Sequence, residues 1–334
     1  MSDLKVAVLG GGSWGTTVAS LVSRNNPVSL WARNPDTVEQ INTEHRNNTY
    51  LPEVMLPEKL IATHRIEDAV SFADVVVMGI PSQHFRRVLN DVKAHVRRGA
   101  PVISLSKGLE LDTRLRMSEI IKEVLPDHPA GVLTGPNLAR EIMEGKAAAS
   151  VLAMEDNTIV QELQPIFNSG LFRTYTNTDV IGCELGGVLK NIVAIAVGIG
   201  DGLGAGDNTR AGLITRGLAE ITRLGVAMGG QPETFAGLAG MGDMIATCTS
   251  PQSRNHHVGI ELGKGRDMGD ITNEMFMVAE GVKSAPAVLA LAAQYKVEMP
   301  MVEDVYRVLS GESSASRAFR SLLRVEAGAE SEPG

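Results

Sequence analysis

The sequence predicts an α/β fold in which a doubly wound parallel sheet is followed by an all-α C-terminal domain. A glycine-rich turn follows the first apolar run, at Val6–Leu9. Short apolar runs then alternate with helical patterns through the first half of the chain, as in a parallel sheet with helices on both faces. After about residue 178 the spacing of apolar residues becomes helical throughout.

The alternation in the first half defines each element of the predicted sheet domain. Strands are expected at Lys5–Leu9, Val28–Trp31, Leu60–Ala62, Val75–Gly79, Pro101–Ser104 and Gly131–Leu133. Helices are expected at Ser13–Ser23, Pro35–Asn42, Ile66–Ser71, Ser82–Lys93 and Thr113–Val124. Because ligands of such sheets bind at the carboxyl ends of the strands, the residues just after each strand are the candidates for function.

The second half is predicted to consist of helices. They are expected over residues 180–199, 211–228, 251–264, 284–295 and 301–309. We therefore expect a sheet domain over residues 1–178 and a helical domain over residues 179–325. The remaining residues, 326–334, are polar, acidic and rich in glycine, and this composition predicts a disordered tail.

Composition narrows the class of protein. The 334 residues are 43% hydrophobic, which suits a globular protein of two domains, and the net charge is −8. No run of Lys and Arg indicates nucleic-acid binding, although a local basic pocket can still hold an anion. Two cysteines, Cys183 and Cys248, are expected to be inert buried thiols. Few thiols, no recognisable signal peptide and no sufficiently long apolar stretch predict a cytoplasmic protein without membrane insertion.

The glycine turn has the pattern Gly-x-Gly-x-x-Gly, formed by Gly10, Gly12 and Gly15. The first glycine allows a sharp turn, the second lets the backbone approach a pyrophosphate, and the third lets the next helix pack on the strand. The amino end of that helix offers N–H groups and a positive dipole end to phosphates. A glycine-rich surface turn is the alternative, but the strand–turn–helix–strand context favours a Rossmann-type dinucleotide site.

The end of the second strand bears on the choice of cofactor. An NAD-binding fold usually has an acidic residue there to bind the ribose hydroxyls. Here Arg33 occupies the region and the first acid is Asp36. Arg33 favours a 2′-phosphate, and hence NADP or tolerance of it, whereas the alternative is an arginine in a solvated loop.

Three later strand ends carry polar residues. Ser82 is expected to cap the helix that follows the fourth strand. Lys107 can reach a phosphate or a carbonyl, although many lysines are simply exposed. Gly135 and Pro136 predict a turn after which Asn137 can cap a helix, and the backbone there can approach a substrate.

Lys190 interrupts an otherwise apolar helix. Its face is expected to carry Gly186, Gly187, Ala194 and Val197, whose mostly small side chains leave room for a ligand over the lysine. Burying a lysine is costly without a partner and lowers the pKa of an ammonium group, which suits a proton donor or acceptor. The alternative is a lysine that extends along the helix into solvent.

A second glycine-rich segment, Gly237–Met244, is expected to form a turn that presents Asp243. The apolar neighbours of this carboxylate argue against a purely solvated side chain. Asp243 is therefore expected to bind a substrate hydroxyl or to pair with Lys190. The alternative is a helix cap, which is a common position for aspartate.

Ser250 and Pro251 predict the start of another helix. Ser253, Arg254 and Asn255 then bring a hydroxyl, a guanidinium and an amide to the positive end of that helix. These groups suit an anion, because arginine contacts phosphate in bidentate geometry. The alternative is an exposed polar first turn.

Together these segments resemble the bacterial NAD(P)-dependent glycerol-3-phosphate dehydrogenases over about residues 4–325. The motifs that carry the resemblance are Gly-Gly-Gly-Ser-Trp-Gly-Thr at 10–16, Leu-Trp-Ala-Arg-Asn at 30–34, Ser-Lys-Gly-Leu-Glu at 106–110, Thr-Gly-Pro-Asn at 134–137, Leu-Lys-Asn at 189–191, Gly-Met-Gly-Asp at 240–243 and Ser-Arg-Asn at 253–255. One departure is Asn137, where many relatives have serine.

The resemblance implies reversible reduction of dihydroxyacetone phosphate to sn-glycerol 3-phosphate with NADPH or NADH, which supplies phospholipid synthesis. It implies that Lys190 is the general acid/base, oriented by Asp243, and that the protein is a homodimer. The substrate contacts it implies are Lys107, Gly135, Asn137, Lys190, Asp243, Ser253, Arg254 and Asn255. Beside the glycine turn, the cofactor contacts it implies are Ser13, Trp14, Arg33, Lys107, Ala139, Arg254, Val278 and Glu280.

Two other functions stay open on the sequence alone. A dehydrogenase of the same build could act on another small anion, such as a 3-hydroxyacid or a sugar acid. A non-catalytic NADP-binding sensor could use the helical half to bind partners. Lys190 on its face of small residues argues against the sensor, because a sensor does not need a proton donor there.

Overall fold

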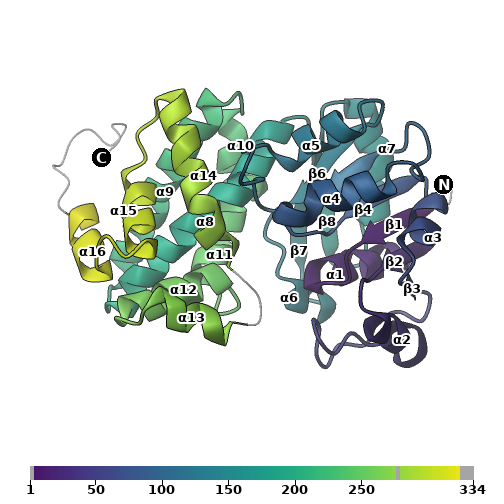
Figure 1. The fold of residues 1–334 in the computed structure, drawn as a ribbon, viewed down its shortest axis with the longest axis horizontal. Helices are drawn as coiled ribbons and strands as arrows, with labels where there is room; N and C mark the ends of the chain where they lie inside the picture. Colours follow the sequence, from purple (N-terminus) through teal and green to yellow (C-terminus); the bar gives the residue numbers. More distant parts are fainter. Residues whose placement is uncertain (1–3, 276–278, 324–334) are drawn as a thin grey trace. The chain divides into compact units, whose positions relative to one another are not determined.

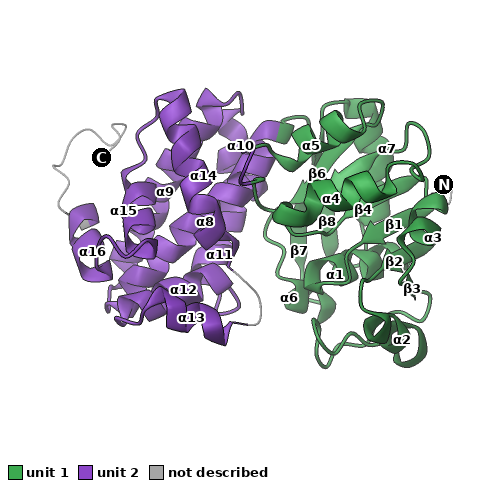
Figure 2. Cartoon of the chain, viewed as in Figure 1, with its two compact units in different colours: residues 1–110, 115–180 green, residues 111–114, 181–334 purple. Residues whose placement is uncertain are grey.

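The computed structural model describes residues 4–275 and 279–323 (Figure 1). The chain divides into two compact units, which are coloured separately in Figure 2. Unit 1 comprises residues 1–110 and 115–180, and unit 2 comprises residues 111–114 and 181–334.

Two sequence predictions fall wholly or partly outside the described residues. The tail at residues 326–334 lies outside them, and so does the predicted cofactor contact Val278. The sequence places the domain boundary after residue 178, and the two compact units divide after residue 180.

Unit 1 is built on an eight-stranded sheet in the order β3-β2-β1-β4-β5-β6-β7-β8. The strands are β1 (Val6–Leu9), β2 (Val28–Trp31), β3 (Ile61–Thr63), β4 (Val75–Met78), β5 (Val102–Ser104), β6 (Ala130–Thr134), β7 (Ala148–Met154) and β8 (Phe172–Asn177). The predicted α/β class is therefore confirmed. The six predicted strands, β1 to β6, pair parallel as expected. The two strands that were not predicted extend the sheet, because β7 pairs antiparallel with β6 and parallel with β8.

Helices cover both faces of this sheet, as the sequence predicts. They are α1 (Ser13–Val22), α2 (Pro35–Glu44), α3 (Ile66–Ser71), α4 (Ser82–Val92), α5 (Met117–Val124), α6 (Ala139–Met143) and α7 (Asn157–Phe167). Side chains alternate between the faces along a strand. In β1, Val6 and Val8 pack in one core with α1, α2 and α7, whereas Ala7 and Leu9 pack in the other with α3, α4 and α5.

Three local predictions of helix starts in the first half of the chain are wrong. Ser82 is the first residue of α4 and not its cap, because the extended residue before the helix is Pro81. Asn137 does not cap α6, since that helix starts at Ala139 and its N-cap position is Leu138. The helix expected from Thr113 starts only at Met117.

Unit 2 is helical, as predicted. Its elements are α8 (Val180–Gly202), α9 (Asp207–Ala227), α10 (Pro232–Ala236), a π-helical turn η1 (Leu238–Gly242), α11 (Asp243–Thr249), α12 (Arg254–Gly263), α13 (Met268–Glu274), α14 (Glu280–Tyr295), α15 (Pro300–Leu309) and α16 (Ala315–Leu323). Within the described residues, α8 alone is long and apolar enough to cross a membrane, contrary to the expectation from the sequence. Its most apolar window is 94% buried inside the structure, so α8 is a core helix of this fold.

Close packing of glycines joins α8 to α12. A Cβ on Gly198 would lie 2.2 Å from the carbonyl oxygen of His256, and one on Gly259 would lie 2.2 Å from that of Ile195. These distances are far below ordinary contact, so only glycine lets the two backbones approach this closely. The packing fixes the position of α12 on α8 and leaves no room for a larger residue at either site.

Glu220 on α9 is a buried carboxylate that meets the amino end of α15. Its side chain is 2% exposed and accepts hydrogen bonds from the backbone N–H groups of Met301 at 2.8 Å and Val302 at 3.4 Å. Burial raises the pKa of Glu220 to about 7, and the two N–H donors oppose this rise only in part. The carboxyl group is therefore protonated in the folded protein at a pH where it is ionised in the unfolded chain.

This raised pKa predicts a loss of stability between about pH 4.5 and pH 7. In that window the folded state binds the extra proton, so stability falls as the pH rises, by roughly 3 kcal/mol in total. Glu220→Gln removes the titration, and its unfolding free energy relative to wild type should increase by that amount from pH 5 to pH 8. The exposed Glu303 in the first turn of α15 provides the matched glutamate for a control Glu303→Gln variant. Parallel profiles of wild type and Glu220→Gln would refute this prediction.

Candidate active site

The glycine turn lies where the order of the strands reverses, between β1 and β4. Gly10 has a φ of 126°, and a Cβ there would lie 2.3 Å from the carbonyl oxygen of Gly79. A Cβ on Gly15 would lie 2.0 Å from the carbonyl oxygen of Gly10. Both positions thus require glycine for the backbone path. In contrast, a Cβ on Gly12 would meet no atom within 4 Å, so the backbone there borders open space that a ligand can enter.

The amino end of α1 fits a phosphate group. Gly12 is the N-cap, no side chain caps the helix, and its first turn contains no acidic residue. The hydroxyl of Ser13 donates a hydrogen bond to the carbonyl oxygen of Tyr50 at 2.8 Å, so Ser13 can offer a ligand its backbone N–H and its lone pairs. The ring of Trp14 lies 6.2 Å from that of Phe172, and its buried Nε1 donates to no acceptor in the described part of the chain.

Arg33 lies in the loop after β2 and is exposed. Across residues 4–275 and 279–323 it makes no hydrogen bond or ion pair with another side chain. The next residue, Asn34, is structural, because its side chain accepts a hydrogen bond from the backbone N–H of Asp36 and caps α2. The loop is therefore held by Asn34, which leaves the guanidinium of Arg33 available for a ligand.

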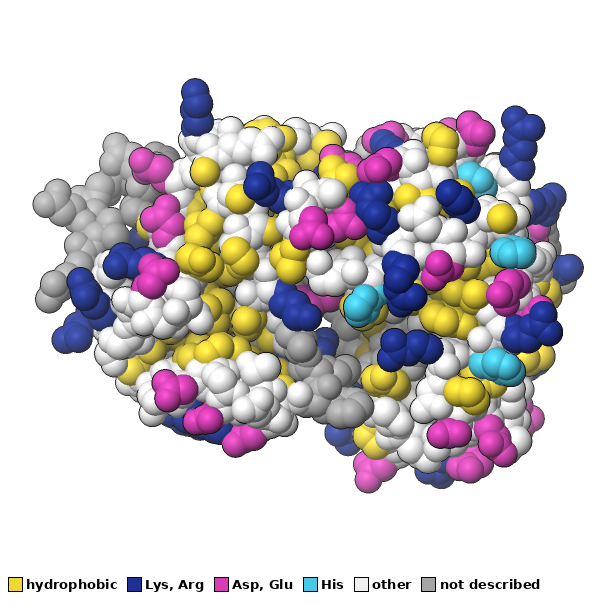
Figure 3. Space-filling view, viewed as in Figure 1, with side chains coloured by type: hydrophobic (Ala, Val, Ile, Leu, Met, Phe, Trp, Pro, Cys, Tyr) yellow, Lys and Arg dark blue, Asp and Glu magenta, His cyan; other side chains and the backbone are white. Residues whose placement is uncertain are grey.

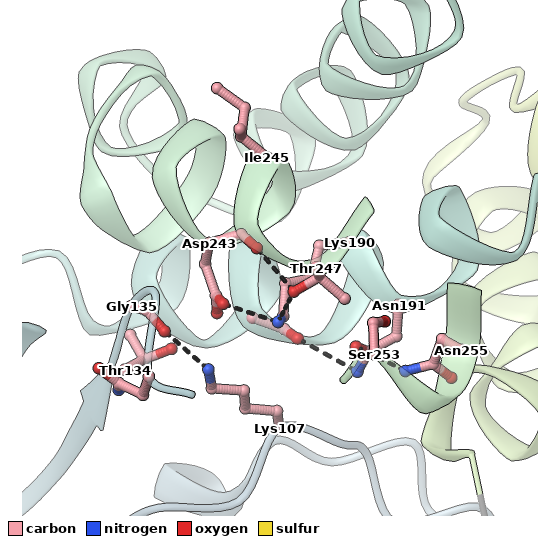
Figure 4. Close-up of polar contacts among 12 residues, drawn as sticks. Lys107, Thr134, Gly135, Lys190, Asn191, Asp243, Ile245, Thr247, Ser253 and Asn255 are labelled. Carbon is pink, nitrogen blue, oxygen red and sulfur yellow. Dashed lines mark hydrogen bonds and ion pairs between the residues drawn. The ribbon is translucent and has the colours of Figure 1, made fainter. Parts of the chain in front are cut away.

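The ends of β5 and β6 meet through Lys107. The Nζ atom of this half-buried lysine donates to the carbonyl oxygen of Gly135 at 2.8 Å (Figure 4). Gly135 has a φ of 129° and a Cβ there would lie 3.2 Å from Ser150, so the turn requires glycine. The Nδ2 atom of Asn137 donates to the Ser150 hydroxyl, whereas Asn137 Oδ1 and Thr134 Oγ1 are buried without a partner in the described structure.

Lys190 and Asp243 form a buried ion pair in unit 2. The Nζ atom of Lys190 lies 2.7 Å from Asp243 Oδ1, and the two side chains are 6% and 2% exposed. Lys190 also donates to the hydroxyl of Thr247, which in turn donates to the backbone carbonyl of Asp243 at 2.6 Å (Figure 4). The predicted pairing of Lys190 with Asp243 is confirmed. These contacts direct the ammonium group from two sides.

The burial of this pair has an energetic consequence. Removing two charges from water costs several kcal/mol for each ion, and their attraction offsets that cost only with good geometry. Replacing both partners of such a buried pair by apolar side chains is often neutral or stabilising, so the pair is weak evidence of a role in stability alone. A lysine kept here, charged and oriented, is suited to donate a proton or to stabilise a developing negative charge.

Gly186, one of the small residues predicted beside Lys190, packs against backbone. A Cβ on Gly186 would lie 2.6 Å from the carbonyl oxygen of Ala239 in the π-helical turn η1. The small side chain at this position thus accommodates the backbone that leads to Asp243. The segment around Gly240 is helical and not an irregular turn, so the expected turn is wrong. Single π-helical turns occur often at functional sites.

Helix α12 starts at Arg254, three residues after the predicted Pro251. Ser253 is its N-cap and accepts from the backbone N–H of His256 at 3.3 Å, so the prediction that Ser250 caps this helix is wrong. Arg254 is exposed as the first helical residue. The hydroxyl, the guanidinium and the helix end are therefore adjacent, as an anion site requires.

Asn255, the third residue of this group, is buried in a network of amides. Its Nδ2 donates to Asn191 Oδ1 at 3.0 Å (Figure 4). Its Oδ1 accepts from the backbone N–H of Gly281 at 2.9 Å. Asn255 thus links α12 to α8, beside Lys190, and to α14, whose first residue is Glu280. Ala139 is likewise the first residue of its helix, α6, in unit 1.

Two site residues were missed from the sequence. Thr247 lies four residues after Asp243 on α11, a spacing that puts both on one helix face, but the segment was interpreted as a turn. Asn191 is the neighbour of Lys190 and belongs to the Leu-Lys-Asn motif, yet no sequence signal indicated that its side chain meets Asn255.

The remaining predictions about side chains concern the cysteines and the surface. Cys183 and Cys248 are buried thiols that form no disulfide in the described residues, as predicted. Burial raises the pKa of the Cys248 thiol to about 12, so it is protonated at neutral pH and is no nucleophile.

On the face shown in Figure 3, lysine and arginine side chains are scattered among acidic ones.

Comparison with protein families agrees with this geometry. The family model described as NAD-dependent glycerol-3-phosphate dehydrogenase N-terminus matches residues 5–160. The model described as NAD-dependent glycerol-3-phosphate dehydrogenase C-terminus matches residues 179–320.

Individual proteins are similar over nearly the whole chain. Glycerol-3-phosphate dehydrogenase (NAD(P)+) 2 of Sphingopyxis alaskensis is 65% identical over 331 residues, which cover 99% of both chains. Glycerol-3-phosphate dehydrogenase (NAD(P)+) of Mycobacterium avium is 51% identical and covers 97% of this chain and 95% of its own. The crystal structure of glycerol-3-phosphate dehydrogenase from Coxiella burnetii is 37% identical, with a TM-score of 0.91 over 96% of this chain and 99% of that one.

Proposed function

The chain belongs to the NAD-dependent glycerol-3-phosphate dehydrogenase family, and from this membership we propose that it reduces dihydroxyacetone phosphate reversibly to sn-glycerol 3-phosphate with NADPH or NADH. The observation that carries the proposal is the buried pair of Lys190 and Asp243 with Thr247 in contact. The experiment that tests it follows the oxidation of NADPH by dihydroxyacetone phosphate.

Lys190 is the proton donor in this proposal. In the direction of reduction, negative charge develops on the oxygen of the substrate's C2 carbonyl. The ammonium of Lys190 stabilises this charge and transfers a proton to the oxygen, which becomes the hydroxyl of the product. In the reverse direction, neutral Lys190 accepts the proton. Asp243 and Thr247 support this role because their hydrogen bonds orient Nζ.

The amino end of α12 is the proposed binding site of the substrate phosphate. Arg254 supplies a guanidinium that can contact two phosphate oxygens at once. The N–H groups of the first turn and the hydroxyl of Ser253 add further donors. Asn255 is engaged with Asn191 and Gly281, so its contribution is proposed to be the positioning of this turn as well as substrate contact. The substrate contacts of Lys107, Gly135 and Asn137 also remain proposals.

The glycine turn is the proposed site of the cofactor's pyrophosphate. Gly12 borders the open space, and the amino end of α1 supplies N–H donors. When bound, the nicotinamide cofactor supplies the hydride for the reduction. Ser13, Trp14, Arg33, Lys107, Ala139, Arg254 and Glu280 are proposed as further contacts of the cofactor.

Arg33→Asp is expected to reverse the choice of cofactor. Arg33 can pair with the 2′-phosphate of NADPH, whereas an aspartate at this position repels it and accepts the ribose hydroxyls of NADH. We expect kcat/KM for NADPH to fall by about tenfold or more and kcat/KM for NADH to be kept or to rise. Arg33→Gln is the matched variant that removes the arginine without adding an acid. It should lower kcat/KM for NADPH and leave kcat/KM for NADH unchanged. An unchanged ratio of the two kcat/KM values in Arg33→Asp would refute the role of Arg33.

The cellular setting is part of the proposal. The product, sn-glycerol 3-phosphate, is the backbone of glycerophospholipids, so the enzyme is proposed to supply their synthesis in the cytoplasm. A homodimer is proposed from the family resemblance. Exposed apolar side chains in unit 2, among them Val226 and Tyr295, support an interface there. Sedimentation velocity of the whole protein tests this, and a monomer at micromolar concentration would refute it.

A further inference from the structure

Asn47, between α2 and β3, contacts the glycine turn although it is 32 residues beyond Gly15 in the sequence. Its side chain is completely buried. The Nδ2 atom donates to the carbonyl oxygen of Gly11 at 2.9 Å and to the hydroxyl of Thr16 at 2.9 Å. Its Oδ1 atom accepts no hydrogen bond in the described part of the chain, so Nδ2 alone ties this side chain to its surroundings.

The bond to Gly11 fixes a direction that matters for an anion. The carbonyl of Gly11 and the N–H of Gly12 belong to one planar peptide group and point to opposite sides of it. A hydrogen bond that holds the Gly11 carbonyl therefore also sets the direction of the Gly12 N–H. Glycine has the largest backbone conformational freedom of all residues. Without the hydrogen bond from Asn47, this peptide group between two glycines would sample many orientations.

Open space borders the backbone at Gly12. A Cβ on Gly12 would meet nothing within 4 Å, whereas one on Gly11 would lie 2.7 Å from the Cβ of Ala32. A second tie holds the same loop in place, because Ser13 Oγ donates to the Tyr50 carbonyl and the backbone N–H of Leu51 donates to the Asn47 carbonyl at 2.8 Å. The loop at residues 47–51 is thus fastened to the turn at two points.

We propose that Asn47 is a positioning residue of the dinucleotide site, whose amide sets the Gly11–Gly12 peptide plane and directs the Gly12 N–H toward the pyrophosphate. This inference rests on the proposed cofactor site. It concerns the affinity for the cofactor and not the proton transfer. Asn47 itself contacts the backbone of the turn, so its loss should weaken binding without a direct effect on catalysis.

The test measures the Kd of NADPH by nucleotide fluorescence in the absence of substrate. Asn47→Ala should weaken NADPH binding by about tenfold, because the N–H donor is no longer pre-oriented. Asn47→Asp keeps the shape of the side chain but removes the Nδ2 donor, and it should weaken binding at least as much. At saturating NADPH, kcat and the KM for dihydroxyacetone phosphate should stay within about twofold of wild type.

Two controls separate this role from general stability. Thr16→Val removes the second acceptor of Nδ2 from an equally buried site but keeps the bond to Gly11, so it should lower the thermal midpoint and leave the Kd unchanged. Asn42 ties α2 to β3 through the backbone of Ala62, away from the turn, and Asn42→Ala should also leave the Kd unchanged.

The outcomes are distinguishable. A wild-type Kd in Asn47→Ala, or an equal loss of affinity in Thr16→Val, would overturn this inference while the proposed function stands. A wild-type protein that binds neither NADPH nor NADH would overturn the proposed function and this inference with it.

Discussion

Lys190→Ala is expected to lower kcat for the reduction of dihydroxyacetone phosphate by about a hundredfold or more, with the Kd of NADPH nearly unchanged. The variant lacks the proton donor and the positive charge that stabilises the developing alkoxide. The glycine turn, which is built from other residues in unit 1, is left intact. Steady-state kinetics and NADPH titration together measure the two effects.

A loss of folding must be separated from a loss of catalysis in this variant. Removing Lys190 alone leaves the carboxylate of Asp243 buried without its partner, which costs about 3–5 kcal/mol of stability. The double variant Lys190→Met with Asp243→Asn has no buried charge, so its stability should recover while kcat stays low. Lys264, which pairs with Glu261 at 2.8 Å but is exposed, provides the control, and Lys264→Ala should retain wild-type kcat. Near-normal turnover in the double variant would rule out Lys190 as the acid/base.

Arg254→Ala is expected to raise the KM for dihydroxyacetone phosphate by about a hundredfold. The loss corresponds to about 2–3 kcal/mol, which is typical when a charged hydrogen-bond partner of an anion is removed. Arg266, paired with Glu261 and Glu274, is an arginine of the same unit away from the start of α12. Arg266→Ala should therefore leave this KM near that of wild type.

A phosphate-free substrate shows whether the arginine acts on the phosphate. With dihydroxyacetone, Arg254→Ala and wild type should have similar, low kcat/KM, because the group that Arg254 contacts is missing. If Arg254→Ala changed the kcat/KM of both substrates by the same factor, the guanidinium would not be a phosphate ligand.

Much of unit 1 up to β6 was predictable because the local signals agree with the fold. The apolar run at β1, the glycine turn and the helix that follows it each specify their own structure, and the bounds of β1 and α1 differ from prediction by one residue at one end. β7 and β8 were not predicted. β7 begins with the small residues Ala148, Ala149 and Ser150, which give a weak strand signal. In β8, buried Phe172 and Thr174 alternate with exposed Arg173 and Tyr175, a strand pattern that the sequence prediction overlooked.

The sequence predicted site residues most clearly where a single charged residue stands among apolar neighbours. Lys190 was conspicuous because a charge in an apolar helix needs a partner, and Asp243 was conspicuous because its neighbours in the sequence are apolar. Asn47 and Asn191 have ordinary polar side chains in the sequence, and their importance comes from partners 36 and 64 residues away. Such contacts depend on tertiary structure, which no local pattern encodes.

Two local features were predicted wrongly from the sequence for the same physical reason. Ser250 followed by Pro251 has the pattern of a helix start, but Ser253 caps the helix instead, and Pro251 lies in the turn before it. The glycines of Gly237–Gly242 indicated a turn, yet they form a π-helical turn because Gly186 and Gly240 allow close contact with α8 and Phe235. In both cases tertiary packing decided between alternatives that local preference left nearly equal.

The most direct test of the proposed function is the oxidation of NADPH by the wild-type protein with three substrates: dihydroxyacetone phosphate, dihydroxyacetone and a small 2-keto acid. We predict rapid oxidation with dihydroxyacetone phosphate, with sn-glycerol 3-phosphate as the product, and kcat/KM values lower by about a hundredfold or more for the other two. No oxidation with dihydroxyacetone phosphate, or equal turnover of a phosphate-free substrate, would contradict the proposed function.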